Sequence, residues 1–168
     1  FTDFPANFNP TPGPDRRSFD TRKLEGPFTP EDQFFTTQHY GHPTIDAATY
    51  RLKVTGLVER PKSLSLDDLK KMGKEELIAG FECSGNRRPT QGLSSNGRWN
   101  GLPLKAVLDS AGVKASAREF VFLGADHGEE EVEFRTQKYK LDQQFGRSLT
   151  REKALSNEPF LAYALNGE

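Results

Sequence analysis

Cys83 is the only cysteine in this chain of 168 residues, so no internal disulfide bond can hold the fold together. The fold must therefore be stabilised by the packing of apolar residues, and a chain of this length suffices for one domain with a substantial core. Only 34% of the residues are hydrophobic, whereas 28% are charged. The core is therefore modest for the size of the chain. That fits either a loop-rich surface or an interior partly occupied by a large polar cofactor.

Short apolar runs and helical spacings alternate irregularly along the chain, which predicts an α+β fold with mixed β-sheets and short helices. The expected strands lie at 50–58, 77–81, 120–123, 132–134 and 160–165. A short helix is expected to follow the N-cap Ser65 and run to about Met72, and a second helix spans 104–111 and ends at Gly112. The strand at 120–123 is expected to be buried. The acidic run at 129–133 predicts a solvated loop, or a docking site for a basic electron-transfer partner.

The first 33 residues differ in composition from the rest of the chain. They hold six of the eleven prolines, and phenylalanines recur among them without a hydrophobic period. This pattern favours an extended arm, 1–33, packed over the surface of a domain at 34–168. The chain opens on Phe1 and stops at Glu168 directly after a strand-like run, so we expect the domain to be incomplete at its C-terminal end.

The charge balance and the motifs that are missing from the sequence narrow the class of protein. A formal net charge of −1 argues against nucleic acid or an anionic membrane as the main partner, and no apolar run reaches membrane-spanning length. The chain has neither the cysteines of a c-type haem or iron–sulfur site nor a Rossmann glycine fingerprint. We therefore expect any redox chemistry to pass its electrons to a separate partner or to a domain that this sequence lacks.

Cys83 has an unusual local setting, because a small residue, a glycine and an asparagine follow it, and then Arg87 and Arg88. Small residues let the backbone approach a bulky group, and two guanidinium groups favour an ionised thiolate and bind anions. The pattern favours a thiolate ligand to a soft metal beside an anionic cofactor. The residues alone also permit a structural cysteine at a strand end and two solvated arginines.

A nucleophilic cysteine is a third interpretation, with His39 or His127 as the base. That class needs a group that orients the base, and no local signature of such an enzyme accompanies Cys83. On these residues alone, the metal-ligand and structural interpretations both stay open.

Several segments resemble the sulfite oxidase family of mononuclear molybdenum enzymes, which carry molybdopterin. The segment around Cys83 is similar to the metal-ligand segment of that family. Further similar segments occur in the order of the family at 50–58, 61–69, 98–104, 107–113, 124–126 and 161–168. The resemblance covers about Phe34 to Glu168 and implies a sulfite-oxidase-type molybdopterin-binding fold. The next motif of the family, a His-Gly…Arg motif that binds cofactor, is not in this sequence.

The resemblance implies Mo-molybdopterin as the cofactor, with Cys83 as a metal ligand beside the two dithiolene sulfurs of the pterin. Arg87 and Arg88 would stabilise an oxidised metal and attract an anionic substrate, as catalytic residues. The segment that wraps the pterin corresponds to Phe35, Thr36, Thr37, Gln38 and His39. Asp126 corresponds to an aspartate that accepts hydrogen bonds from the pterin, although a turn-capping role would also explain it.

Thr37 departs from the family pattern, because sulfite-oxidising members usually have an arginine at this position, and Gln38 replaces an asparagine. Losing a charge-assisted hydrogen bond to sulfite removes about 1.5–3 kcal/mol of binding free energy. We therefore expect an oxyanion or a sulfoxide as substrate, with sulfite used poorly. A cytochrome or another external electron-transfer protein would complete the reaction. The resemblance points to the bacterial periplasm as the location, although the residues also permit the cytoplasm. The alternative function is that of a non-catalytic scaffold or binding domain with the same fold.

Overall fold

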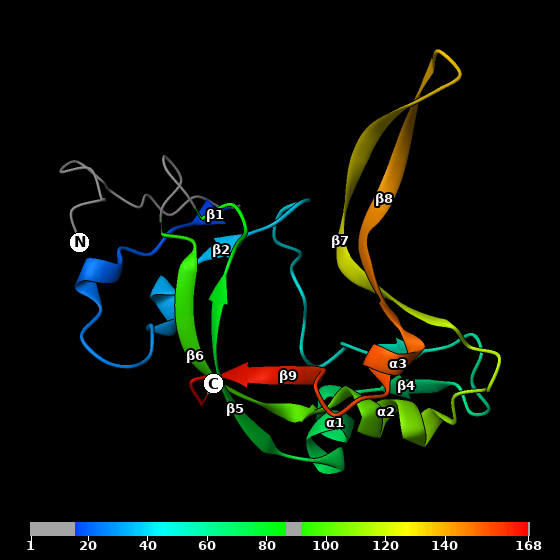
Figure 1. The fold of residues 1–168 in the computed structure, drawn as a ribbon, viewed down its shortest axis with the longest axis horizontal. Helices are drawn as coiled ribbons and strands as arrows, with labels where there is room; N and C mark the ends of the chain where they lie inside the picture. The colour runs from blue at the N-terminus through cyan, green and yellow to red at the C-terminus, as the bar shows by residue number, and fades with distance from the viewer. Residues whose placement is uncertain (1–15, 87–91, 168) are drawn as a thin grey trace. The chain divides into compact units, whose positions relative to one another are not determined.

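The computed structural model describes residues 16–86 and 92–167, and its chain divides into two compact units (Figure 1). Among the described residues, the first unit comprises 16–38, 73–86, 92–102 and 161–167. The second unit comprises His39–Met72 and Pro103–Phe160. Each unit is described by itself below.

The first unit is built on a three-stranded sheet of β5 (Glu75–Glu82), β6 (Ser94–Pro103) and β9 (Phe160–Leu165), in the order β5-β6-β9. Strands β5 and β6 are antiparallel and paired along the whole of β5, from Glu75 opposite Gly101 to Glu82 opposite Ser94. The Trp99 ring lies against the rings of Phe34 and Phe81, with centroid distances of 5.5 and 5.1 Å. This aromatic group packs beside the paired strands β5 and β6.

Residues 16–37 lie against the same sheet. They contain β1 (Arg16–Arg17), the 3₁₀ turns η1 (Thr21–Lys23) and η2 (Glu31–Gln33), and β2 (Thr36–Thr37), which pairs with β1 in an antiparallel manner. Phe19 is only 4% exposed, and its backbone N–H donates to the carbonyl of Gly92. The part of the expected arm that the structure describes is thus ordered against its unit. The boundary expected between 33 and 34 stays a prediction.

The second unit has its core around helix α2 (Leu104–Ala111). Leu104 and Leu108 are buried with Ala154 of helix α3 (Arg151–Ala154), and partly buried apolar residues pack around them. The unit also contains the antiparallel pair β3 (Leu52–Val54) and β4 (Lys62–Leu64), helix α1 (Leu66–Met72), and the hairpin of β7 (Glu119–Phe134) and β8 (Gln137–Thr150). The strand expected at 50–58 is therefore shortened to three residues.

The two helices expected from the sequence are confirmed, together with the residues that begin and end them. Ser65 and Asp68 cap α1 reciprocally: the Asp68 N–H donates to Ser65 Oγ, and both the N–H and the hydroxyl of Ser65 donate to Asp68 Oδ2. Helix α2 ends at Gly112, whose φ of 71° lies in the left-handed region. Its N–H donates to the carbonyls of Leu108 and Asp109, which closes the helix.

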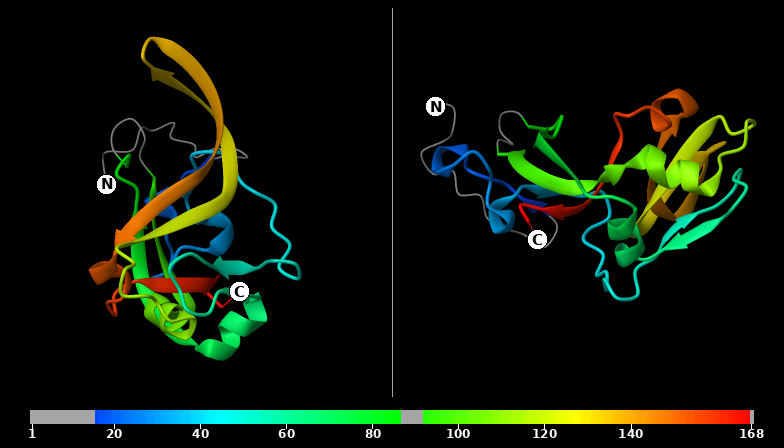
Figure 2. Two further views of the ribbon diagram at one scale, coloured as in Figure 1. Left: turned by 90° about the vertical axis from the view of Figure 1, so that its right-hand side faces the viewer. Right: turned by 90° about the horizontal axis from the view of Figure 1, so that it is seen from below.

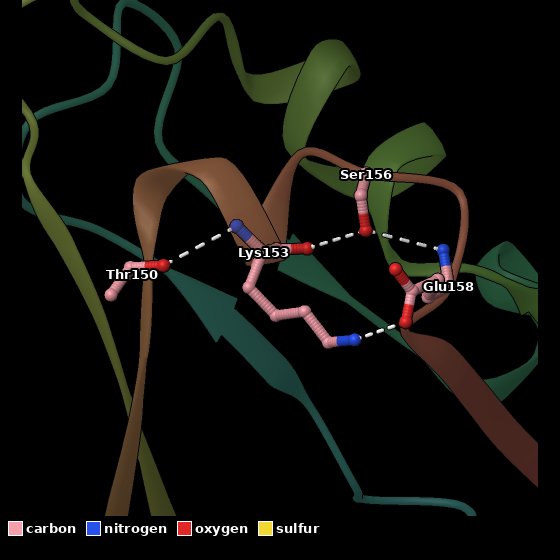
Figure 3. A network of polar contacts seen from close by, with 4 residues as sticks. All are labelled: Thr150, Lys153, Ser156 and Glu158. Atoms are coloured by element: carbon pink, nitrogen blue, oxygen red, sulfur yellow. Dashed lines mark hydrogen bonds and ion pairs between the residues drawn. The ribbon is translucent and has the colours of Figure 1, made fainter.

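A network of polar contacts fixes the turn that contains α3 (Figure 3). Thr150 caps the helix by accepting from the Lys153 N–H at 3.4 Å, and the Lys153 carbonyl accepts from the Ser156 hydroxyl at 2.9 Å. The Lys153 ammonium pairs with the Glu158 carboxylate, whose residue also donates its N–H to Ser156 Oγ. These contacts hold Ala154 against the α2 core.

The β7–β8 hairpin corrects the sequence analysis. The strands expected at 120–123 and 132–134 belong to one 16-residue strand, and the acidic run at 129–133 is part of it rather than a loop. Glu129 and Glu131 pair with Lys140 and Lys138 of the neighbouring strand, so alternate charges lie across a ladder. Strand β8 was not expected at all.

The hairpin extends well beyond α2 and α3 within its unit (Figures 1 and 2). The residues expected to form a buried strand are exposed in part, since Val121 and Leu123 are each 64% exposed. The apolar run alone could not show whether anything covers it. The α+β class, in contrast, is confirmed, and no helix in the described part of the chain has the length and apolarity to cross a membrane.

Candidate functional site

Cys83 follows directly after β5, as the sequence predicts, and begins a tight turn. Its backbone N–H donates to the carbonyl of Leu93 at 2.9 Å, which extends the β5–β6 pairing by one residue. Its carbonyl accepts from the N–H of Asn86 at 2.8 Å, and this bond closes the turn. The backbone on both sides of the thiol is therefore fixed.

Asn86 holds this turn to the returning chain. Its Oδ1 accepts from the N–H of Leu93 at 3.0 Å, and its Nδ2 donates to the Glu82 carboxylate at 2.8 Å. Leu93 is 2% exposed, so its N–H would otherwise be buried without a partner. Asn86 thus satisfies the turn backbone, as expected for an asparagine at such a position.

The thiol of Cys83 is half-buried and is not part of a disulfide. Its sulfur accepts a hydrogen bond from the N–H of Gly85 at 3.4 Å, a contact that favours negative charge on sulfur. The side chain is thus accessible, oriented and soft, which fits a single thiolate ligand to a soft metal. Within residues 16–86 and 92–167, no three His, Cys, Asp or Glu side chains gather where they could hold a metal ion.

Gly92 closes the segment that follows Cys83. Its φ of 90° is left-handed, and a Cβ at this position would lie 2.6 Å from the carbonyl oxygen of Phe19. Only glycine fits this close approach of two backbones. Arg87 and Arg88, expected to lie beside the metal, fall outside the described residues.

The segment expected to wrap the pterin lies in part in the first unit. The N–H of Phe35 donates to Ser95 Oγ of β6 at 3.0 Å, and the Phe35 ring stacks on Phe34 at 6.0 Å. Thr36 and Thr37 form β2, in which Thr36 is half-buried and Thr37 is exposed. Gln38, also half-buried, is the last residue of this unit.

His39 and Asp126 belong to the second unit, where both lie at β7. His39 Nε2 lies 2.8 Å from Glu130 Oε1, and the His39 side chain is 54% exposed. Asp126 is in an irregularity of β7, because the register with β8 shifts between Leu123 and His127. Asp126 therefore lies within a strand bulge, not in the turn that the sequence permitted. The predicted site residues thus divide between the units, with 35–38 and Cys83 in the first and His39 and Asp126 in the second.

Two residues of this region escaped the sequence analysis. Tyr40 interacts with Glu130, the same carboxylate that His39 contacts. Burial, and then this contact, raises the pKa of Tyr40, while the bonds from His39 and Tyr40 lower the pKa of Glu130. The lysines at 138 and 140 follow the acidic run 129–133 at a distance that a hairpin could bridge. This complementary charge was the signal that could have placed Glu130 on a strand.

Comparisons with known proteins show the family to which the chain belongs. The family described as "Oxidoreductase molybdopterin binding domain" matches residues 39–168, a range that contains His39, Cys83 and Asp126. The chain is 33% identical over 162 residues to mitochondrial sulfite oxidase of Mus musculus, covering 86% of this chain and 28% of that protein. It is 32% identical over 163 residues to a nitrate reductase [NADH] of Ulva prolifera, covering 86% of this chain and 18% of that protein.

A solved structure shows the same fold. The crystal structure of the sulfane dehydrogenase SoxCD from Paracoccus pantotrophus matches with a TM-score of 0.75 and 27% identity, over 99% of this chain and 42% of that chain. The family match over residues 39–168 is thus accompanied by similarity to relatives in sequence and to a solved structure in fold. The chain belongs to the oxidoreductase molybdopterin-binding domain family. It spans less than half the length of each of these relatives.

Proposed function

We propose that the protein is a molybdenum-dependent oxidoreductase that acts on a small sulfur-containing substrate. It transfers an oxygen atom to or from this substrate, or oxidises or reduces the substrate in another way. The electrons pass to an external carrier such as a cytochrome. The observation that carries the proposal is Cys83, an accessible thiol held by a fixed turn in a molybdopterin-binding domain. When bound, Mo-molybdopterin would supply the redox-active metal and its oxygen-atom chemistry.

Each predicted residue then has a role that the chain itself can perform. Cys83 would give one thiolate ligand, held in place by Asn86 and by the N–H of Gly85. Arg87 and Arg88 would bring positive charge to an anionic substrate. The segment Phe35 to His39, together with Asp126, would contact the pterin, with the Asp126 carboxylate as acceptor for ring N–H groups.

Sulfur-containing substrates are supported by the relatives, since two of them are named for sulfite and for sulfane. Thr37 favours a substrate other than sulfite. Its exposed side chain in β2 offers one neutral hydroxyl where the family usually has a guanidinium. Arg98, which could have replaced that charge, lies over the Phe28 ring at 5.0 Å and pairs with Glu76.

Steady-state kinetics of the full-length protein with sulfite and with a dialkyl sulfoxide test this choice of substrate. We expect the sulfoxide to have the higher kcat/KM, and Thr37→Arg to raise kcat/KM for sulfite about tenfold or more, as one charge-assisted bond would. Thr37→Val, which adds no charge, is the matched control. Efficient oxidation of sulfite by the wild type at low KM would overturn the assignment from Thr37. If a molybdenum-loaded protein turned over neither sulfite nor the sulfoxide with any electron carrier, the non-catalytic scaffold would be favoured.

A further inference from the structure

Glu130 differs from the acidic residues beside it in what it contacts. Glu129 and Glu131 form ion pairs with Lys140 and Lys138, as expected for charges across a β-ladder. Glu130 instead accepts a hydrogen bond from His39 Nε2 at 2.8 Å, and it also interacts with Tyr40, the next residue along the chain. All of these residues belong to the second unit. One carboxylate on β7 therefore fastens the segment that contains a predicted cofactor residue.

The surface of β7 beneath this segment is shaped to receive it. Gly128 lies two residues before Glu130, on the same face of the strand, and a Cβ there would lie 2.5 Å from Cδ1 of Tyr40. The missing side chain lets the Tyr40 ring lie against the strand. The His39 ring then lies edge-on to Tyr40 at 4.4 Å and near Phe145 at 5.8 Å. The imidazole is thus held on one edge by a carboxylate and on its sides by two aromatic rings.

The contact with Glu130 determines which nitrogen of His39 carries a proton. The bonds from His39 and Tyr40 keep the pKa of Glu130 below its usual range, so the carboxylate is ionised near neutral pH and can only accept. The proton of a neutral imidazole must then be on Nε2. Nδ1 makes no hydrogen bond within the described residues, and the His39 side chain is 54% exposed.

We propose that Glu130 is a positioning residue: it holds neutral His39 as the Nε2–H tautomer and so presents Nδ1 as an acceptor to an N–H or O–H donor of a bound heterocycle. This assignment rests on the proposed function in so far as the heterocycle is the pterin. Glu130 acts on the heterocycle through His39 in this role. The tautomer and the orientation of the ring follow from this chain alone.

His127 provides a contrast on the same hairpin. Its Nδ1 lies 3.0 Å from Asp142 Oδ1, so a neutral His127 should carry its proton on Nδ1. Two histidines of one strand region are therefore expected in opposite tautomers. This difference makes the proposal directly observable by NMR.

The first experiment measures the tautomers by long-range ¹H–¹⁵N correlation of the histidine rings in the full-length protein, with His39→Gln and His127→Gln for assignment. We expect neutral His39 to have protonated Nε2 and bare Nδ1, and His127 the reverse. Glu130→Ala should move His39 toward the averaged shifts of a free imidazole. Glu130→Gln, whose amide can donate as well as accept, should weaken the preference for Nε2–H, and Glu131→Ala should change nothing. A wild-type His39 with its proton on Nδ1, or the same spectrum in Glu130→Ala, would overturn the proposal.

The second experiment measures the pterin released from purified full-length variants by its fluorescence. The Asn side chain keeps an acceptor near the place of Nδ1, whereas Gln reaches toward Glu130 and removes that acceptor. His39→Asn should therefore retain more pterin than His39→Gln, and Glu130→Ala should bind it about tenfold more weakly, as for other outer residues that orient a ligand. Equal retention in all variants would overturn the role of Nδ1. A wild type without pterin would overturn the proposed function, while the NMR result would still decide whether Glu130 sets the tautomer.

Discussion

The turn that presents Cys83 depends on single side chains at its two ends. Asn86 accepts from the buried N–H of Leu93, and Gly92 allows the returning chain to approach Phe19. Neither residue would bind metal or substrate, yet both fix where the thiol lies. Replacing them should therefore change the position of Cys83 without changing its chemistry.

Asn86→Ala should destabilise the protein, because it leaves the N–H of buried Leu93 without an acceptor. The cost of such an unsatisfied group is about 1–3 kcal/mol of unfolding free energy. Urea unfolding of wild type and variant measures it. Asn86→Asp, which keeps an oxygen for the Leu93 N–H, should lose less, and Asn157→Ala on the exposed surface should lose little. Equal stability of Asn86→Ala and wild type would show that the turn does not need this bond.

The position of Cys83 could be predicted from sequence because an apolar run ends directly before it. The role of Glu130 could not, because four acidic residues so close together resemble a solvated run. The pairing of β7 with β8 shows that Glu129 and Glu131 contact lysines of β8, whereas Glu130 contacts His39. Side-chain direction on a strand follows from register, and register depends on a partner strand that the sequence did not reveal.

The caps of the helices are the elements that the sequence predicted best. Ser65 before α1 and Gly112 after α2 act through their own backbone and side-chain chemistry, so local sequence is sufficient. Strand β9 was likewise predicted with its bounds. The β7–β8 hairpin was not, since its charges alternate with apolar residues over a length that suggested two strands and a loop.

The capping of α1 should make stability depend on pH in the acidic range. Hydrogen bonds from the Ser65 hydroxyl and N–H lower the pKa of Asp68 from its ordinary 3.8. The carboxylate therefore stabilises the folded state above that value, and the contribution is lost as pH falls through the lower pKa of the folded state. Urea midpoints between pH 6 and about pH 3 should fall less steeply for Asp68→Asn than for wild type. Asp67→Asn removes the same charge from the same helical turn without the Ser65 bonds, and an identical pH profile for both variants would contradict this.

The left-handed residue that ends α2 provides a second test at this scale. Gly112→Ala places a Cβ at a φ of 71° and 3.2 Å from Glu59 Cβ, so it should lower the unfolding free energy by about 1 kcal/mol or more. Gly26→Ala is the matched control, because nothing lies within 4 Å of its Cβ and its φ is not left-handed. That variant should be neutral or slightly stabilising. A Gly112→Ala protein as stable as wild type would mean that the helix end relaxes without strain.

At the scale of the whole molecule, the α+β class and the family could be recognised from the sequence, since several short segments match in order. The division into two compact units could not, because each unit gathers segments that are far apart along the chain. The predicted site residues accordingly divide between the units, which a linear pattern cannot show. What the structure adds is a fixed, accessible thiol in one unit and an oriented imidazole in the other.

The most direct test of the central claim is X-ray absorption at the molybdenum edge of the full-length protein, purified from molybdenum-replete cells, with Cys83→Ser alongside. Because a hydroxyl is close to a thiol in volume, Cys83→Ser should leave the fold intact, which circular dichroism can verify. The substitution replaces a soft ligand by a hard one. We expect molybdenum in the wild type, and one sulfur scatterer fewer per metal in Cys83→Ser, with activity lost. A wild type without molybdenum, or a variant with an unchanged sulfur shell and full turnover, would contradict the assignment of Cys83 as the metal ligand.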